Sequence, residues 1–256
     1  MPSMQNTLDV SELYFSELES TASIRSAFHD IVVTNSQVLF TAFSHDKMML
    51  GRLKDSLRLR FVDQNSLYKG LFIQAVSVFE SFIRSTVTYV IDNHVTKEPQ
   101  YSKLELALRN YYISNSGKAL SYFGSGSING VKYDFDKLTE SLASCFNDSE
   151  NYHIESRVFT ISMGNCTSSR LESLFSKLLV SDDIFSKISN DVHLRKVLNE
   201  TRRNNIKALI KDRLDNIIDV RNDIAHGEIT RSVSKDEFED CLQFLRGLIK
   251  ALASAC

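Results

Sequence analysis

Residues 205–227 read NIKALIKDRLDNIIDVRNDIAHG and carry the clearest structural signal in the chain. At 100° per residue, four of the isoleucines in this stretch fall on one side of a helix and His226 falls on the opposite side. This apolar stripe consists of Ile206, Ile210, Ile217 and Ile224. Gly227 follows at the position where helices commonly end. We predict a long amphipathic helix from Thr201 to about Ala225 that buries its isoleucines in an all-α core.

The rest of the chain also favours long helices. Only 2 of its 256 residues are proline, which is poorly tolerated inside helices. Residues 67–91 carry a wide apolar stripe and form the strongest predicted helix of the N-terminal half. Residues 234–254 form another, in which Ser234 is the N-cap and Glu237 completes a capping box. Its inward-facing residues are expected to be Phe238, Leu242, Leu245, Leu248 and Leu252.

The middle of the chain is less regular. We predict one domain, residues 1–256, whose helical core is built from residues 1–92 and 201–256 and interrupted by a mixed, mostly helical insertion at residues 93–200. Inside this insertion, residues 114–134 are rich in Gly and Ser and are expected to form a loop. Residues 152–163, YHIESRVFTISM, have enough β-branched and aromatic residues for a short strand. Short helices are expected at residues 135–145, 168–180 and 182–189.

Composition excludes several classes of protein. A net charge of −2 argues against nucleic-acid binding through bulk charge, so such binding needs a local patch. The four cysteines have no C-x-x-C spacing, which argues against a zinc ribbon or a disulfide scaffold and fits a reducing cytoplasm. The sequence shows neither a signal peptide nor a membrane span. We predict a cytoplasmic protein with no metal site and no cofactor.

The predicted helix at 201–225 has a polar face that ends at His226. Asp212, Asp215, Asp219 and Asn222 lie on it. This face is either simply solvated or forms a polar interface seam. Arg221 lies about 140° from His226 on an ideal helix, near the edge of the apolar stripe. Either its long side chain swings back toward His226, or the last turn before Gly227 is already unwinding, or a buried or half-buried carboxylate holds it. Glu80 is the best candidate for this carboxylate, and Arg84 is an alternative partner for Glu80.

His226 has the properties of an acid–base catalyst. It lies at a helix C-terminus, where the macrodipole favours the imidazolium, and a histidine poised near neutrality both accepts and donates protons. RNA cleavage through the 2′-hydroxyl needs such a base, together with an arginine that stabilises the phosphorane, and it needs no metal.

At these residues the sequence resembles the HEPN superfamily, whose mark is an Arg followed after four to six residues by a His near a helix end. Here the motif reads Arg221-Asn-Asp-Ile-Ala-His226-Gly227, and residues 75–85, AVSVFESFIRS, resemble an early core helix of the superfamily. The resemblance implies an up-and-down helical bundle in which two protomers bring their Arg/His helix ends together in one composite site. Many such proteins are metal-independent endoribonucleases that serve as toxins or antiphage effectors.

Carried over by position, the resemblance implies that Arg221 binds or stabilises the scissile phosphate and that His226 acts as the acid or base. Asn222 would be an accessory polar residue. It implies a homodimer acting on RNA, with tRNA and mRNA as candidate classes, and a cognate antitoxin or defence-system protein as a further partner. Some members keep the fold without cleaving RNA, so a silent interaction or assembly module that binds a protein or a nucleotide is the alternative.

A local basic cluster precedes the motif. Arg203, Lys207 and Lys211 share one flank of the predicted helix. This flank is either a solvated basic face or a rim that tracks RNA phosphates beside the site.

Overall fold

A computed structural model describes residues 3–34, 47–122, 127–128, 131–132, 134–147, 152–161, 163–200, 202–228 and 230–256. Its elements, in chain order, are α1 (Met4–Thr34), α3 (Lys47–Lys97), the 3₁₀ helix η1 (Tyr101–Lys103), α4 (Leu106–Ser121), β1 (Ser127–Ile128), β2 (Val131–Lys132), α5 (Phe135–Phe146), the 3₁₀ helix η2 (Ser156–Thr160), α6 (Ser168–Lys177), α7 (Ile184–Ile188), α8 (Val192–Leu198), α9 (Arg203–Ala225) and α10 (Lys235–Ala255). The predicted all-α fold is confirmed, and β1 and β2 form only a two-residue antiparallel ladder.

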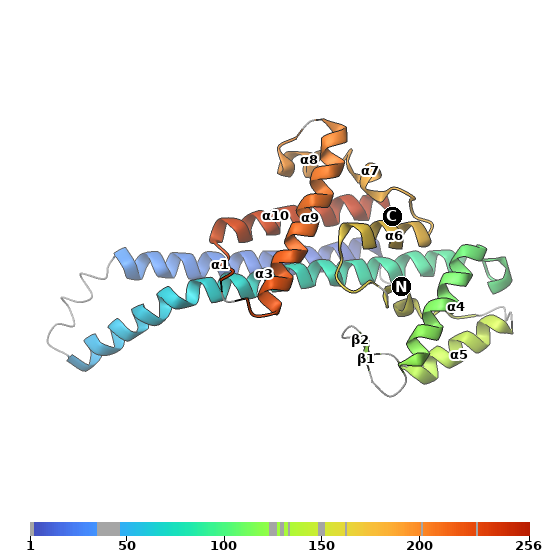
Figure 1. Ribbon diagram of the computed structural model, residues 1–256, viewed down its shortest axis with the longest axis horizontal. Helices are drawn as coiled ribbons and strands as arrows, with labels where there is room; N and C mark the ends of the chain where they lie inside the picture. Colours follow the sequence, from blue (N-terminus) through green and yellow to red (C-terminus); the bar gives the residue numbers. More distant parts are fainter. Residues whose placement is uncertain are drawn as a thin grey trace.

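The core is a bundle of α1, α3, α9 and α10. Figure 1 shows α1, α3 and α10 running roughly along one another, while α9 crosses them steeply. The N-terminal half of α3 and the C-terminal half of α1 project beyond the other helices (Figure 1). The bundle therefore presents the C-terminal end of α9 against the flank of α3.

Helix α3 is longer than the helix predicted at 67–91, because that segment is part of one continuous helix from Lys47 to Lys97. No proline interrupts it, and it ends at Lys97, two residues before Pro99. Its predicted stripe is buried, with Phe79 and Ile83 at 0% exposure and Phe82 at 1%. Full burial of each such side chain contributes about 1.5–3 kcal/mol.

Helix α10 begins as predicted. The Ser234 side chain accepts from the backbone N–H of Glu237, and the Glu237 side chain accepts from the Ser234 N–H. All five of its predicted core residues are buried. The capping box is therefore confirmed.

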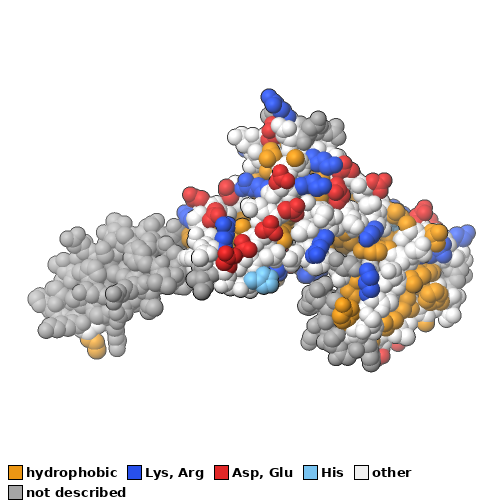
Figure 2. All heavy atoms as spheres, in the orientation of Figure 1, with side chains coloured by type: hydrophobic (Ala, Val, Ile, Leu, Met, Phe, Trp, Pro, Cys, Tyr) orange, Lys and Arg blue, Asp and Glu red, His pale blue; other side chains and the backbone are white. Residues whose placement is uncertain are grey.

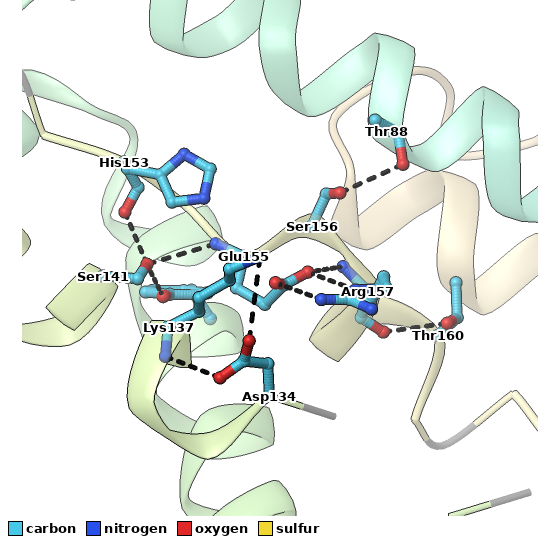
Figure 3. Close-up of polar contacts among 10 residues, drawn as sticks. Thr88, Asp134, Lys137, Ser141, His153, Glu155, Ser156, Arg157 and Thr160 are labelled. Carbon is cyan, nitrogen blue, oxygen red and sulfur yellow. Dashed lines mark hydrogen bonds and ion pairs between the residues drawn. The ribbon is translucent and has the colours of Figure 1, made fainter. Parts of the chain in front are cut away.

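The strand predicted at residues 152–163 is wrong, because residues 156–160 form the 3₁₀ helix η2. Figure 3 shows how this segment satisfies its polar groups locally. Arg157 donates from Nε and Nη2 to the two carboxylate oxygens of Glu155, each at 2.8 Å, and Thr160 donates to the Arg157 carbonyl. Ser156 meets Thr88 of α3 at 3.0 Å. These contacts replace the partner strand that the aromatic and β-branched residues led us to expect.

The loop predicted at residues 114–134 is wrong over its first part, because α4 continues to Ser121. Asn115, Ser116 and Ala119 share a buried helix face with Tyr112, whose hydroxyl contacts Ser141 of α5 at 2.5 Å. Packing therefore overrides the low helix propensity of Ser, Asn and Gly.

The middle segment, residues 93–200, packs on the bundle at two places, one on α9 and α10 and the other on α3. Helices α6, α7 and α8 contact α9 or α10, while η2 contacts α3. Figure 2 shows charged side chains spread over the bundle and an apolar surface near α4 and α5. Exposed apolar residues there are Leu106, Ile113, Leu120, Tyr122 and Phe146.

Candidate functional site

Helix α9 ends as its sequence predicts. His226 is the C-cap, and its N–H donates to the Asn222 carbonyl at 2.8 Å. Gly227 has a φ of +77°, the left-handed conformation that closes helices and favours glycine. The His226 side chain is exposed and makes no hydrogen bond or ion pair with another described residue. It is therefore open to solvent, or to a ligand, in the single chain.

Arg221 turns the other way, into the bundle. Its side chain is 25% exposed, and Nη2 lies 3.9 Å from Oε2 of Glu80 on α3. Arg84 lies at the same distance from the same oxygen. Glu80 was expected to neutralise Arg221, and the structure brings the two together, with Arg84 sharing the carboxylate.

Burial dominates the electrostatics of Glu80. The residue is 6% exposed, and this burial raises the pKa of its carboxyl, while Arg221 and Arg84 lower the pKa only partly. Two arginines beside one carboxylate leave a local excess of positive charge. An anion placed here would therefore meet at least one guanidinium that Glu80 does not fully neutralise.

A buried thiol lies within this charged cluster. Cys166 is fully buried, which raises the pKa of its thiol, and Glu80 raises that pKa further. Arg84, Arg221 and Arg170 lower it by a smaller amount. The thiol therefore stays protonated and is no candidate nucleophile.

The third predicted site residue, Asn222, joins Arg221 to a residue that sequence reasoning missed. Arg221 donates from Nη1 to Oδ1 of Asn222 at 3.2 Å and to Oδ1 of Asn165 at 3.3 Å. The Asn165 amide donates in turn to Oδ1 of Asn222 at 2.9 Å. Asn165 lies 57 residues before Asn222, and no spacing in the sequence connects them.

The polar face of α9 separates into two parts. Asp215 is turned toward α6, where its carboxylate accepts from both the N–H and the hydroxyl of Ser168, each at 2.6 Å. Asp212 and Asp219 are exposed. The predicted seam is thus partly an internal contact with the middle segment and partly solvated.

The predicted phosphate rim meets acidic partners from the middle segment. Lys211 pairs with Glu172 of α6 at 2.9 Å, and Lys207 pairs with Asp183, the N-cap of α7. The Asp183 carboxyl has its pKa lowered to about 2, chiefly by the hydrogen bond from Lys207. The Arg203 side chain lies outside the described residues. Sequence patterns gave no sign of these acidic partners, which are remote along the chain.

The described part of the chain has neither a cluster of metal ligands nor a membrane-spanning helix. No group of three or more His, Cys, Asp or Glu side chains there is arranged to hold a metal ion. None of the helices in the same residues is both long enough and apolar enough to cross a bilayer.

Comparison with known protein families matches residues 50–256 to the family described as RiboL-PSP-HEPN. The matched region begins in α3 and runs through the middle segment to the end of α10. Neither the curated proteins nor the solved structures gave a match. HEPN domains are generally ribonucleases or nucleotide-binding modules. Because the match covers well over half of the chain and includes Glu80, Arg221 and His226, this protein belongs to the RiboL-PSP-HEPN family.

Proposed function

We propose that this protein is a metal-independent RNA endonuclease whose active site is shared between two copies of the chain. One observation carries the proposal: Arg221 is fixed by Glu80, Asn165 and Asn222 at the end of α9, where His226 is exposed one turn further along. An anchored guanidinium and an open imidazole, both near the end of α9, are the two groups that cleavage through the 2′-hydroxyl needs.

The proposed reaction is a transesterification at phosphorus. His226 accepts the proton of the ribose 2′-hydroxyl, and the 2′-oxygen attacks the adjacent phosphorus. Arg221 stabilises the charge on the phosphorane oxygens. The bond from phosphorus to the 5′-oxygen then breaks, and that oxygen receives a proton from an imidazolium. The products are a 2′,3′-cyclic phosphate and a free 5′-hydroxyl.

The geometry of α9 favours a homodimer. Arg221 and His226 are about 140° apart on an ideal helix, and in this chain the guanidinium turns inward while the imidazole turns outward. A base and an acid must also act on opposite sides of the phosphorus. A second α9 end, approaching across a two-fold axis, would supply the second imidazole.

RNA is the proposed substrate, with Arg203, Lys207 and Lys211 tracking its phosphates. Lys207 and Lys211 would exchange Asp183 and Glu172 for phosphate oxygens on binding. A role as a toxin or antiphage effector in the cytoplasm, with a cognate antitoxin or defence partner, is part of the proposal and rests on family membership.

The same ion pairs favour a second candidate, a silent assembly module. Two of the three proposed RNA-binding residues already have carboxylate partners within the chain, as a surface built for packing rather than for phosphate would have. In that case the Arg221 cluster would only stabilise a protein interface.

The test compares purified wild type, His226→Ala and His193→Ala on total RNA, including tRNA, in excess EDTA. His193 is an exposed histidine on α8 and serves as the matched control. We expect discrete cleavage by wild type and His193→Ala, with a loss of at least about a hundredfold in His226→Ala. Cleavage by His226→Ala at the wild-type rate would overturn the site. Absence of cleavage by all three would favour the module.

A further inference from the structure

We propose that Asn165, contributed by the middle segment, is a positioning residue that sets the orientation of the Arg221 guanidinium. This inference rests on the proposed function for its catalytic consequence, but its geometry stands on the structure alone. The Asn165 side chain makes a hydrogen bond with Arg221, at 3.3 Å, and another with Asn222, at 2.9 Å.

Hydrogen-bond chemistry fixes which way the Asn165 amide faces. A guanidinium only donates, so Asn165 must present its oxygen to Nη1 of Arg221. Its NH₂ group then faces Oδ1 of Asn222, which is an acceptor. Reversing the amide would place donor against donor at Arg221 and acceptor against acceptor at Asn222. The arrangement therefore has one orientation.

The loop that carries Asn165 is held from within. Gly164 has a φ of +51°, and a Cβ there would lie 2.4 Å from Nη1 of Arg170. That same Nη1 donates to the carbonyls of Met163 at 3.0 Å and of Asn165 at 3.4 Å. Only glycine gives the Arg170 side chain room to clamp the backbone on either side of position 164.

The other end of the loop is anchored on α9 itself. Asp215 accepts two hydrogen bonds from Ser168, two residues after the buried Cys166. The loop therefore touches α9 at Asp215 and again, about two turns later, at Arg221 and Asn222. A segment fixed at two points of one helix holds Asn165 in a constant register to Arg221.

Asn165 and Asn222 both accept from Nη1 of Arg221, on one edge of the guanidinium. We call this pair of contacts the Asn165 clamp. Nε, by contrast, is buried and makes no hydrogen bond with a described residue, and Nη2 lies 3.9 Å from Glu80, beyond hydrogen-bond distance. In Arg157, by comparison, a carboxylate binds the corresponding edge, because Nε and Nη2 each donate to Glu155 at 2.8 Å. Asn165 thus holds Arg221 short of a full pair with Glu80 and, because Nε is buried, leaves Nη2 as the donor that a phosphate would meet.

The first experiment follows the guanidinium directly by NMR of ¹⁵N-labelled arginine side chains, with Arg221 assigned through Arg221→Lys. In the wild type we expect separate Nη1 and Nη2 signals, because two acceptors slow rotation of the guanidinium. In Asn165→Ala we expect these signals to merge. Asn190→Ala is the matched control, since Asn190 also accepts from an arginine, Arg195, in the middle segment. Separate Arg221 signals in Asn165→Ala would overturn the inference.

The second experiment measures steady-state RNA cleavage. We expect Asn165→Ala to lower kcat about ten- to a hundredfold with little change in KM, because the guanidinium acts on charge formed in the transition state. Adding Glu80→Gln should restore part of kcat, since it removes the carboxylate that captures Arg221. Because kcat is calculated per folded protein, a fall in stability alone would change neither kcat nor KM. An unchanged kcat, or no recovery in the double variant, would overturn the catalytic consequence.

The two outcomes separate the inference from the proposed function. Loss of the resolved Arg221 signals in Asn165→Ala, with no RNA cleavage by the wild type, would keep the clamp and reject the nuclease. If Asn165→Ala does not fold, Asn165→Ser replaces it. The serine keeps a polar group at position 165, but its side chain is too short to reach both Arg221 and Asn222. The Nη1 and Nη2 signals of Arg221 and the value of kcat are then measured in Asn165→Ser.

Discussion

Glu80 is a buried carboxylate that two arginines share without fully compensating its loss of water. Each lies 3.9 Å away, so neither forms a close charge-assisted hydrogen bond. Burial therefore prevails and the pKa of Glu80 is raised above its ordinary value of 4.5. Partial neutralisation of this kind keeps Arg221 in place and leaves it able to bind another anion.

This balance gives a pH dependence of stability with a definite sign. Because the folded-state pKa is raised, folding takes up a proton between pH 4.5 and the raised value, and the stability contributed by Glu80 is lost as pH rises through that window. We expect the free energy of unfolding of wild type to fall relative to Glu80→Gln as pH increases from 4.5. Urea unfolding at several pH values measures it.

Glu140→Gln is the control, since Glu140 is an exposed carboxylate on α5. Its free energy of unfolding should run parallel to wild type over the same window. If wild type instead gains stability relative to Glu80→Gln with rising pH, the arginines outweigh burial and the raised pKa is wrong.

At the scale of elements, helix α6 depends on a cap from another helix. Its own N-cap residue, Thr167, makes no side-chain cap hydrogen bond, and Asp215 of α9 accepts from Ser168 instead. We expect Asp215→Ala to lower the free energy of unfolding by about 1–3 kcal/mol, because it leaves the Ser168 donors without an acceptor. Thermal or urea unfolding measures the loss.

Asp219→Ala tests whether this effect is specific. Asp219 lies one turn further along α9 and is exposed, so its removal should change stability by no more than about 0.5 kcal/mol. Equal stability of the two variants would show that the remote cap contributes nothing. Asp215→Ala would also remove the contacts that hold the Ser168 end of the loop that carries Asn165.

What the sequence predicts at this scale follows from how local each signal is. Helices α3, α9 and α10 were predictable because a buried face repeats every 3.6 residues along the chain itself. The Glu80–Arg221 contact was predictable because a carboxylate on an otherwise apolar face needs a partner. The 3₁₀ helix η2 and the contact of Asn165 with Arg221 were not, since both depend on side chains brought together only by folding.

For the whole molecule, the middle segment covers one flank of α9 and contacts Arg221 and Asn222 near its C-terminus, but it leaves His226 exposed. Glu172 and Asp183 bind the two lysines of that flank, and Asp215 binds α6. His226, by contrast, is exposed, and its side chain makes no hydrogen bond or ion pair with another described residue. If a second copy completes the site, it approaches at His226.

Mixing wild-type and His226→Ala chains tests such a shared site. A site that needs both imidazoles is active only in wild-type dimers, so an equal mixture of co-expressed chains should retain about a quarter of the activity of wild type at the same total concentration. Independent sites would retain about half, because each wild-type chain would act alone. Single-turnover RNA cleavage across several mixing ratios distinguishes a quadratic from a linear dependence. Mixtures with His193→Ala should keep full activity at every ratio, and a linear dependence for His226→Ala would rule out the composite site while leaving a one-chain nuclease possible.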